Sequence, residues 1–234
     1  MKKIILISTI LCSFFAFSQK MKFGAKVGLN ISNLKGDYPE EIDEQDSKTG
    51  IHLGVFAEYK INEKFTLQPE LLYSIQGNTY GYKNYYDSGS YYEGADYNLN
   101  INYLNLPIIF KFKIIEKLSI DFGPQLGYVL SAKTKINITE DSRDPSQNYS
   151  IEIDMLNDAT YNFGGTTIQG KASLNRLDYS FNIGSTYEIT EKIFIQGRYN
   201  LGLSAIDRNS TNGTDTNSWN MKNSVIQLSA GFRF

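Results

Sequence analysis

The stretch that decides the fold is Ser224 to Phe234, at the C-terminal end, which reads S-V-I-Q-L-S-A-G-F-R-F. Every second residue from Ile226 onward is apolar, and the residues between them are glycine or polar. Because successive side chains of a strand point to opposite faces, this stretch predicts a β-strand with one apolar and one polar face. Such a strand occurs in a transmembrane β-barrel, whose apolar face contacts lipid. It also occurs in a soluble sandwich or lipocalin-like barrel, whose apolar face is the core.

The same alternation recurs along the chain. Seven further stretches show it, at residues 22–31, 51–61, 65–75, 104–113, 118–130, 177–188 and 193–203. Each is about as long as the ~9–11 residues that a tilted strand needs to cross a bilayer. No amphipathic helix of any length competes with them. The chain is therefore predicted to be all-β, with eight strands in one domain.

The connections between these stretches alternate in length. Three are short and contain a recurring Ile-x-Glu-Lys segment, at residues 61–64, 114–117 and 189–192. Each is predicted to be a tight hairpin turn. Four are long and polar, at about residues 33–49, 77–100, 131–173 and 207–222. Short turns at one end and long loops at the other are typical of outer-membrane barrels, with the short end periplasmic and the long end extracellular.

These observations together predict an eight-stranded antiparallel up-and-down transmembrane β-barrel with short periplasmic turns and long extracellular loops. A soluble lipocalin-like barrel would have mostly short hairpins at both ends. Within the longest loop, residues 135–138 and 149–153 alternate again. We expect them to extend the fifth and sixth strands beyond the membrane.

Composition and the N-terminus place the protein in a compartment. The formal net charge of −2, without a basic stripe, does not suggest a nucleic-acid partner. Lys2 and Lys3 precede an apolar run that is too short to span a bilayer, and small residues at 16 and 18 suit cleavage before Gln19. We therefore predict a signal peptide at residues 1–18, a barrel domain at 19–234, and export to the outer membrane. The single cysteine, Cys12, lies in the signal peptide, so the mature chain is expected to have no disulfide and no cysteine metal site.

Several segments carry a resemblance to a known family. They are residues 68–74 with Gly77, 103–107, 123–128, Asp178 with Gly184 and Glu188, and 198–199 with 202–203. In these segments the chain resembles the PorT-like outer-membrane β-barrel family of the Bacteroidetes. The resemblance implies an outer-membrane barrel, and most members of that family have no assigned activity. One branch of it works in the type IX secretion and gliding apparatus, which makes an accessory role there an alternative function.

The polar faces of the strands carry charges of both signs. We predict a lumen charge network of Lys26, Glu58, Glu70, Lys111, Asp121, Asp178, Glu188, Arg198 and Arg233. An eight-stranded barrel is only wide enough for its own side chains to fill, and buried charges must be paired. These charges are therefore interpreted as a paired polar plug, with a narrow porin-like channel as the alternative.

Two further features bear on function. The only histidine, His52, is predicted to lie at the rim of its strand and to face inward, with no serine in its own motif. The chain is therefore expected to have no catalytic residues, and also no cofactor and no metal site. A possible recognition loop contains Tyr80, Tyr82, Tyr85, Tyr86, Tyr91 and Tyr92 among small polar residues, a composition found in adaptable binding loops. The alternative is an aromatic girdle with ordinary loop packing.

The predicted function is accordingly that of a monomeric integral outer-membrane protein with a structural or interaction role and no catalysis. Its expected partners are outer-membrane lipid, the barrel-assembly machinery and an extracellular or periplasmic protein.

Overall fold

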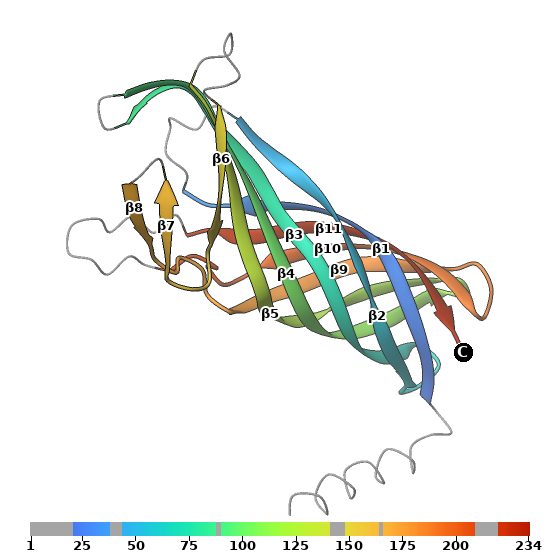
Figure 1. The fold of residues 1–234 in the computed structure, drawn as a ribbon. Coiled ribbons are helices and arrows are strands. Elements are labelled where there is room, and N and C mark those ends of the chain that lie inside the picture. The colour runs from blue at the N-terminus through green and yellow to red at the C-terminus, as the bar shows by residue number, and fades with distance from the viewer. Residues whose placement is uncertain (1–20, 38–43, 88–89, 141–147, 164–165, 209–219) are drawn as a thin grey trace, which may run out of the picture.

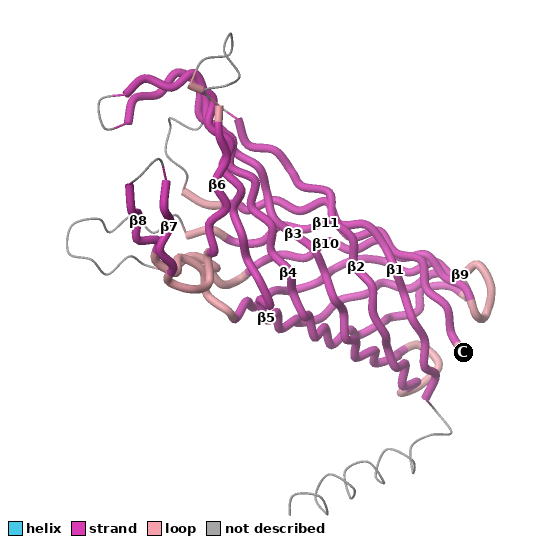
Figure 2. Tube along the Cα trace, in the orientation of Figure 1, coloured by secondary structure: helices cyan, strands magenta, loops and turns pink. Residues whose placement is uncertain are grey.

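A computed structural model describes residues 21–37, 44–87, 90–140, 148–163, 166–208 and 220–234. Most of them lie in strands (Figure 1, Figure 2). The strands are β1 (Met21–Lys35), β2 (Glu44–Lys60), β3 (Phe65–Asp87), β4 (Ser90–Ile115), β5 (Leu118–Thr139), β6 (Tyr149–Asp154), β7 (Ala159–Phe163), β8 (Thr166–Gly170), β9 (Leu177–Glu188), β10 (Ile193–Gly202) and β11 (Lys222–Arg233). No helix in these ranges is long and apolar enough to cross a membrane.

Eight of these strands close into an antiparallel barrel. Around the ring the order is β1, β2, β3, β4, β5, β9, β10 and β11, and every neighbouring pair is hydrogen-bonded. The ring closes where β11 pairs with β1 over a long register, from Gly24 opposite Arg233 to Lys35 opposite Lys222. The predicted eight-stranded up-and-down barrel is thus confirmed. The short strands β7 and β8 form a separate hairpin beside one end.

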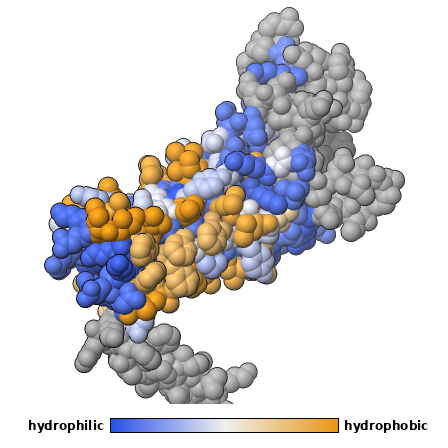
Figure 3. Space-filling model, turned by 180° about the vertical axis from the view of Figure 1, so that it is seen from behind, coloured by the Kyte–Doolittle hydropathy of each residue, from blue (hydrophilic) through white to orange (hydrophobic). Residues whose placement is uncertain are grey.

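The burial pattern shows which face of each strand points outward. On β11, Leu228 is 54% exposed, whereas the neighbouring Gln227 is 2% exposed. The other ring strands repeat this pattern, with polar side chains buried inside and apolar side chains exposed outside. Figure 3 shows these apolar side chains covering the barrel body between hydrophilic ends. A soluble barrel would bury its apolar face, so the soluble interpretation is wrong and the apolar face is a lipid-facing band.

The three predicted tight turns lie together at one end of the barrel. In the β2–β3 turn the side-chain oxygen of Asn62 accepts two backbone N–H bonds, both at 2.9 Å, and Thr190 does the same in the β9–β10 turn at 3.0 and 3.2 Å. In the β4–β5 turn the corresponding residue is Ile115, which has no side-chain oxygen. It pairs directly with Leu118 across a two-residue turn. Strand β1 begins and β11 ends at this same end (Figure 1).

At the opposite end, segments predicted to be loops are largely strands. Residues 77–87 continue β3 and residues 90–100 belong to β4; the two strands reach 23 and 26 residues and pair almost to their tips. Residues 135–138 extend the fifth strand, β5, as predicted. Residues 149–153 do not extend the sixth strand, β9, because they form β6, which pairs antiparallel with β5. Polar composition cannot separate a loop from such a ribbon, since beyond the membrane no lipid requires one face of a strand to be apolar.

A small apolar core closes this long end of the barrel. We call it the outer cap, formed by Leu34, Leu99, Ile101, Tyr103, Val129, Ala132, Leu156, Leu174 and Ile206. Its last three members belong to connecting segments, which are held together through their backbones. The Leu174 N–H donates to Met155 O at 2.9 Å, and the Asn175 N–H donates to Ile206 O at 2.7 Å. The connections therefore fold over the barrel mouth and bury apolar side chains inside it.

Candidate functional site in the barrel lumen

The lumen is filled by side chains from every strand of the ring. Of the nine charged residues predicted to face it, eight are buried and Glu188 is half-buried. They do not form one network. Four belong to a cluster in the middle of the barrel, four belong to a cluster near the short-turn end, and Asp178 lies apart from both.

The central cluster is built around Glu70 on β3. Arg198 on β10 donates to both of its carboxylate oxygens, at 2.6 and 2.9 Å, and Lys26 Nζ on β1 lies 2.7 Å from Glu70 Oε2. Asp121 supplies the second carboxylate, 3.8 Å from Arg198, and accepts a hydrogen bond from Gln196 at 2.7 Å. Two cations thus face two carboxylates. The cluster is neutral as a whole, which is what allows these charges to be buried.

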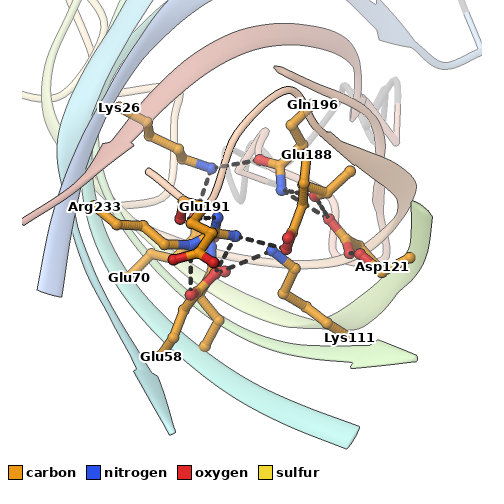
Figure 4. Close-up of polar contacts among 12 residues, drawn as sticks. Lys26, Glu58, Glu70, Lys111, Asp121, Glu188, Glu191, Gln196 and Arg233 are labelled. Atoms are coloured by element: carbon orange, nitrogen blue, oxygen red, sulfur yellow. Dashed lines mark hydrogen bonds and ion pairs between the residues drawn. The ribbon is translucent and has the colours of Figure 1, made fainter. Parts of the chain in front are cut away.

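A second neutral cluster lies toward the short-turn end (Figure 4). Glu58 accepts from Arg233 at 2.7 and 3.1 Å and from Lys111 at 3.2 Å. Arg233 also reaches Glu188, at 3.0 Å. Strands β2, β4, β9 and β11 are therefore tied together across the lumen by ion pairs. The pairing supports the interpretation of these charges as a plug.

An aromatic pair packs in the lumen beside the second cluster. The rings of Phe56 and Phe194 meet edge to face, with centroids 5.5 Å apart, and Arg233 lies 4.8 Å from the Phe194 centroid. Both rings need glycine on the neighbouring strand. A Cβ at Gly24 would lie 2.2 Å from Phe56, and one at Gly231 would lie 2.1 Å from Phe194. We call Phe56 and Phe194 the aromatic partition of the lumen.

His52 lies in the middle of β2, not at its rim, because β2 extends back to Glu44. The structure brings it to a serine from the far end of the chain. Its Nε2 is 2.8 Å from Ser229 Oγ, and its Nδ1 is 2.8 Å from Asn30 Oδ1. The Asn30 amide nitrogen donates to Ser74 at 2.9 Å, so its oxygen is left to accept from the histidine ring.

This arrangement resembles the serine–histidine–amide sets that activate nucleophiles. Its environment differs, because His52 and Asn30 have no exposed surface and Ser229 is 8% exposed. Both ring nitrogens of His52 are engaged by neighbouring side chains, one by Ser229 and the other by Asn30. We assign the three residues to a buried hydrogen-bonded layer that ties β1, β2 and β11 together.

Asp178 sits near the outer cap at the start of β9, whereas Glu188 ends that strand at the opposite side of the membrane. It accepts hydrogen bonds from Asn223 at 2.6 Å and Ser204 at 2.9 Å. Among the described residues no cation lies within ion-pair distance of it. Its separation along the barrel axis keeps it out of both charged clusters.

Comparison with known proteins agrees with this architecture. The model of the outer membrane protein β-barrel domain matches residues 17–208. The chain belongs to this outer-membrane β-barrel family. The matched residues end before β11, the strand that closes the ring. The protein is accordingly an outer-membrane barrel, with its short turns in the periplasm and its long connections outside the cell.

Solved structures of small outer-membrane barrels are similar to it at low identity. Neisserial surface protein A is 13% identical, with 91% of this chain and 97% of that chain covered and a TM-score of 0.45. Ail, the attachment invasion locus protein of Yersinia pestis, is 14% identical, with coverage of 92% and 99% and a TM-score of 0.45. OprG from Pseudomonas aeruginosa is 12% identical, with coverage of 91% and 95% and a TM-score of 0.39. No curated protein matches the chain.

The predicted tyrosine loop is a β-ribbon that this outer-membrane barrel extends beyond its outer end (Figure 1). Tyr80 on β3 stacks on Tyr97 on β4, with ring centroids 4.8 Å apart, and Tyr82 meets both rings edge to face. Tyr85 and Tyr86 pair with Tyr92 and Tyr91 in the strand register, but their side chains lie outside the described part of the structure. The described tyrosines form one aromatic cluster above the outer cap.

Polar contacts hold the rest of this outer sheet. The ion pair of Lys133 with Glu152, at 2.6 Å, links β5 to β6, and that hydrogen bond raises the pKa of Lys133. A hydrogen bond from Asn157 lowers the pKa of Asp154 at the end of β6. Within the described ranges no group of histidine, cysteine and carboxylate residues could hold a metal ion. The predicted signal peptide, residues 1–18, lies outside the described residues.

Proposed function

We propose that this outer-membrane barrel is a monomer that does not conduct solutes and that acts through a structural or interaction role, without catalysis. The observation that carries the proposal is the filled lumen. Two neutral ion clusters, the aromatic partition and the outer cap succeed one another along the barrel axis. A channel would need a continuous wet path, and here the polar side chains are directed at one another.

The charges themselves argue against a pore. Glu70 has no exposed side-chain surface, and Arg198 has 1%. An ion entering this space would have to displace ion pairs that are already formed, and eight-stranded barrels leave no room beside them. The narrow-channel alternative therefore receives no support from the lumen geometry.

Planar-bilayer conductance tests this proposal directly. The wild-type protein should give no steady single-channel steps. As a matched comparison, Phe56→Ala with Phe194→Ala removes the aromatic partition and leaves both ion clusters in place. The proposal would be overturned if the wild-type protein gave steady single-channel steps and the double variant gave steps of higher conductance.

The interaction role is assigned to the parts outside the membrane. The β3–β4 ribbon presents a stacked aromatic cluster, and tyrosine supplies large contact area at low entropic cost. We propose that this ribbon contacts an extracellular protein or glycan. Crosslinking in cells followed by pull-down should recover a partner that is lost in Tyr80→Ser with Tyr82→Ser and kept in a variant with the exposed Lys83 changed to Gln. Equal recovery from all three proteins would remove the ribbon from the proposal.

The sequence resemblance to the PorT-like family supports a second role, as an accessory of a type IX secretion and gliding apparatus. The same crosslinking experiment addresses it, because periplasmic secretion components would then be recovered independently of the two tyrosines. We also propose that the first 18 residues are removed as a signal peptide and that the barrel-assembly machinery inserts the mature chain. N-terminal sequencing of the protein from outer membranes should begin at Gln19.

A further inference from the structure

The periplasmic end of the lumen is an open cavity. It has a volume of about 730 Å³ and is lined by the ends of β1, β2, β4 and β11 and by the short turns. We call it the inner cup. Its floor is the ion cluster of Glu58, Lys111, Arg233 and Glu188 (Figure 4). The aromatic partition packs against that floor, since Lys111 and Arg233 lie 5.2 and 4.8 Å from the centroid of the Phe194 ring. A molecule that enters the cup from the periplasm therefore stops at the floor.

The walls of the inner cup carry more cations than carboxylates. They contribute five lysines, at positions 22, 60, 64, 113 and 117, and three glutamates, at positions 63, 116 and 191. The four charged floor residues cancel one another, so the walls leave a net charge of five minus three, or +2. Within the described part of the chain, none of the five wall lysines has a carboxylate at ion-pair distance.

The floor also retains donor capacity. Arg233 is committed to Glu58, to Glu188 and to the backbone oxygen of Glu191. Among the described residues Lys111 donates only to Glu58, at 3.2 Å, and its ammonium group has three N–H donors. Its side chain is 5% exposed and lines the cup. A buried cation with unused donors thus lies at the bottom of a cavity whose walls are rich in lysine.

We propose that the inner cup binds a small multivalent anion with two or more phosphate or carboxylate groups, taken from the periplasmic side. The volume lies in the usual range of about 300–1,000 Å³ for small-molecule sites. Lysine is a common phosphate ligand that acts as a point charge, and flexible wall lysines can close around an anion that Lys111 holds from below. The chemistry is shared by soluble oligoanions and by the headgroups of anionic phospholipids.

Calorimetric titration of the folded protein in uncharged detergent tests the proposal, with pyrophosphate, citrate and inositol hexakisphosphate as probes. At least one probe should bind saturably at one site per barrel. Lys60→Gln with Lys113→Gln should weaken that binding by roughly tenfold or more, because two charges are lost from the wall. The matched control, Lys171→Gln with Lys192→Gln, removes the same charge from exposed lysines that do not line the cup, and it should leave the affinity within about twofold.

Two comparisons complete the test. Adding Lys111→Met to the wall variant should weaken binding further. The different migration of boiled and unboiled samples on a gel checks that each variant still folds. Nanodiscs with anionic lipid should compete with the soluble probe if a headgroup is the natural occupant, whereas nanodiscs of neutral lipid alone should not. Absence of saturable binding by every probe and by anionic lipid, or equal losses in the wall variant and its control, would overturn the proposal.

Discussion

Replacing Glu70 by glutamine tests whether the central ion cluster holds the barrel together. In the folded protein this carboxylate accepts from Arg198 twice, at 2.6 and 2.9 Å, from Lys26 at 2.7 Å, and from Gln68 at 2.6 Å. The glutamine keeps the shape and loses the charge. Two buried cations then face Asp121 alone, and breaking a buried pair in this way costs about 3–5 kcal/mol of unfolding free energy.

Urea titration of refolding into lipid vesicles, followed by circular dichroism and by gel migration, measures this cost. Lys133→Gln is the matched control, because it breaks an ion pair whose side chains are 55% and 57% exposed, and solvent screening leaves such a pair little effect on stability. Adding Lys26→Met to Glu70→Gln restores neutrality between Arg198 and Asp121. The double variant should therefore lose less unfolding free energy than the sum of the losses in the two single variants. If Glu70→Gln is as mild as Lys133→Gln, the cluster does not stabilise the fold and the reasoning is wrong.

Three further predictions follow from the geometry. Leu228→Arg should destabilise the barrel by about 2–4 kcal/mol if the site lies near the bilayer midplane, more than Gln227→Arg does, and the reverse order in vesicle refolding would contradict the assignment of faces. Gly231→Val should destabilise the barrel because its Cβ would lie 2.1 Å from the Phe194 ring, and Phe194→Leu in the same chain should recover part of the loss in urea titrations. Unboiled and boiled protein should migrate differently on a denaturing gel, because the closed ring leaves no strand edge open, and identical migration would argue against closure.

The strands and turns in the membrane could be predicted because each carries a local signal. Alternation placed the apolar face of all eight ring strands, and β9 has the bounds that its sequence pattern predicts. The same signal fails outside the membrane, where neither face of a strand is buried in lipid. Residues 77–100 were therefore expected to be a loop, although residues 77–87 pair with residues 90–100 as a long ribbon. The partner of β6 also had to come from the structure, since its pairing with β5 depends on where the chain folds back.

The charged lumen positions could be predicted from parity, that is, from which alternate residues of a strand share its polar face. Their partners could not be predicted in this way. Parity says that Glu70 and Arg198 both face inward, whereas their contact depends on the stagger between strands that lie far apart in the chain. The same limit explains why His52 was expected to lack a serine partner, since Ser229 is 177 residues away in the chain. Asp178 has the same parity as the cluster residues and still lies apart, because parity carries no information about position along the axis.

One lumen feature had a sequence signal that could have been used. Phe56 and Phe194 stand at positions whose neighbours on the same face are glycine or polar, and each faces a glycine on an adjacent strand, Gly24 or Gly231. A bulky ring opposite a missing side chain indicates that the ring crosses the lumen. Two such pairs near one end predict a closure there, with the charged residues beyond it facing the periplasm. The aromatic partition, whose residues the strand pattern identifies, therefore separates the inner cup from the rest of the lumen. The lysines of the cup are thus left facing the periplasm, where we propose that they bind an anion.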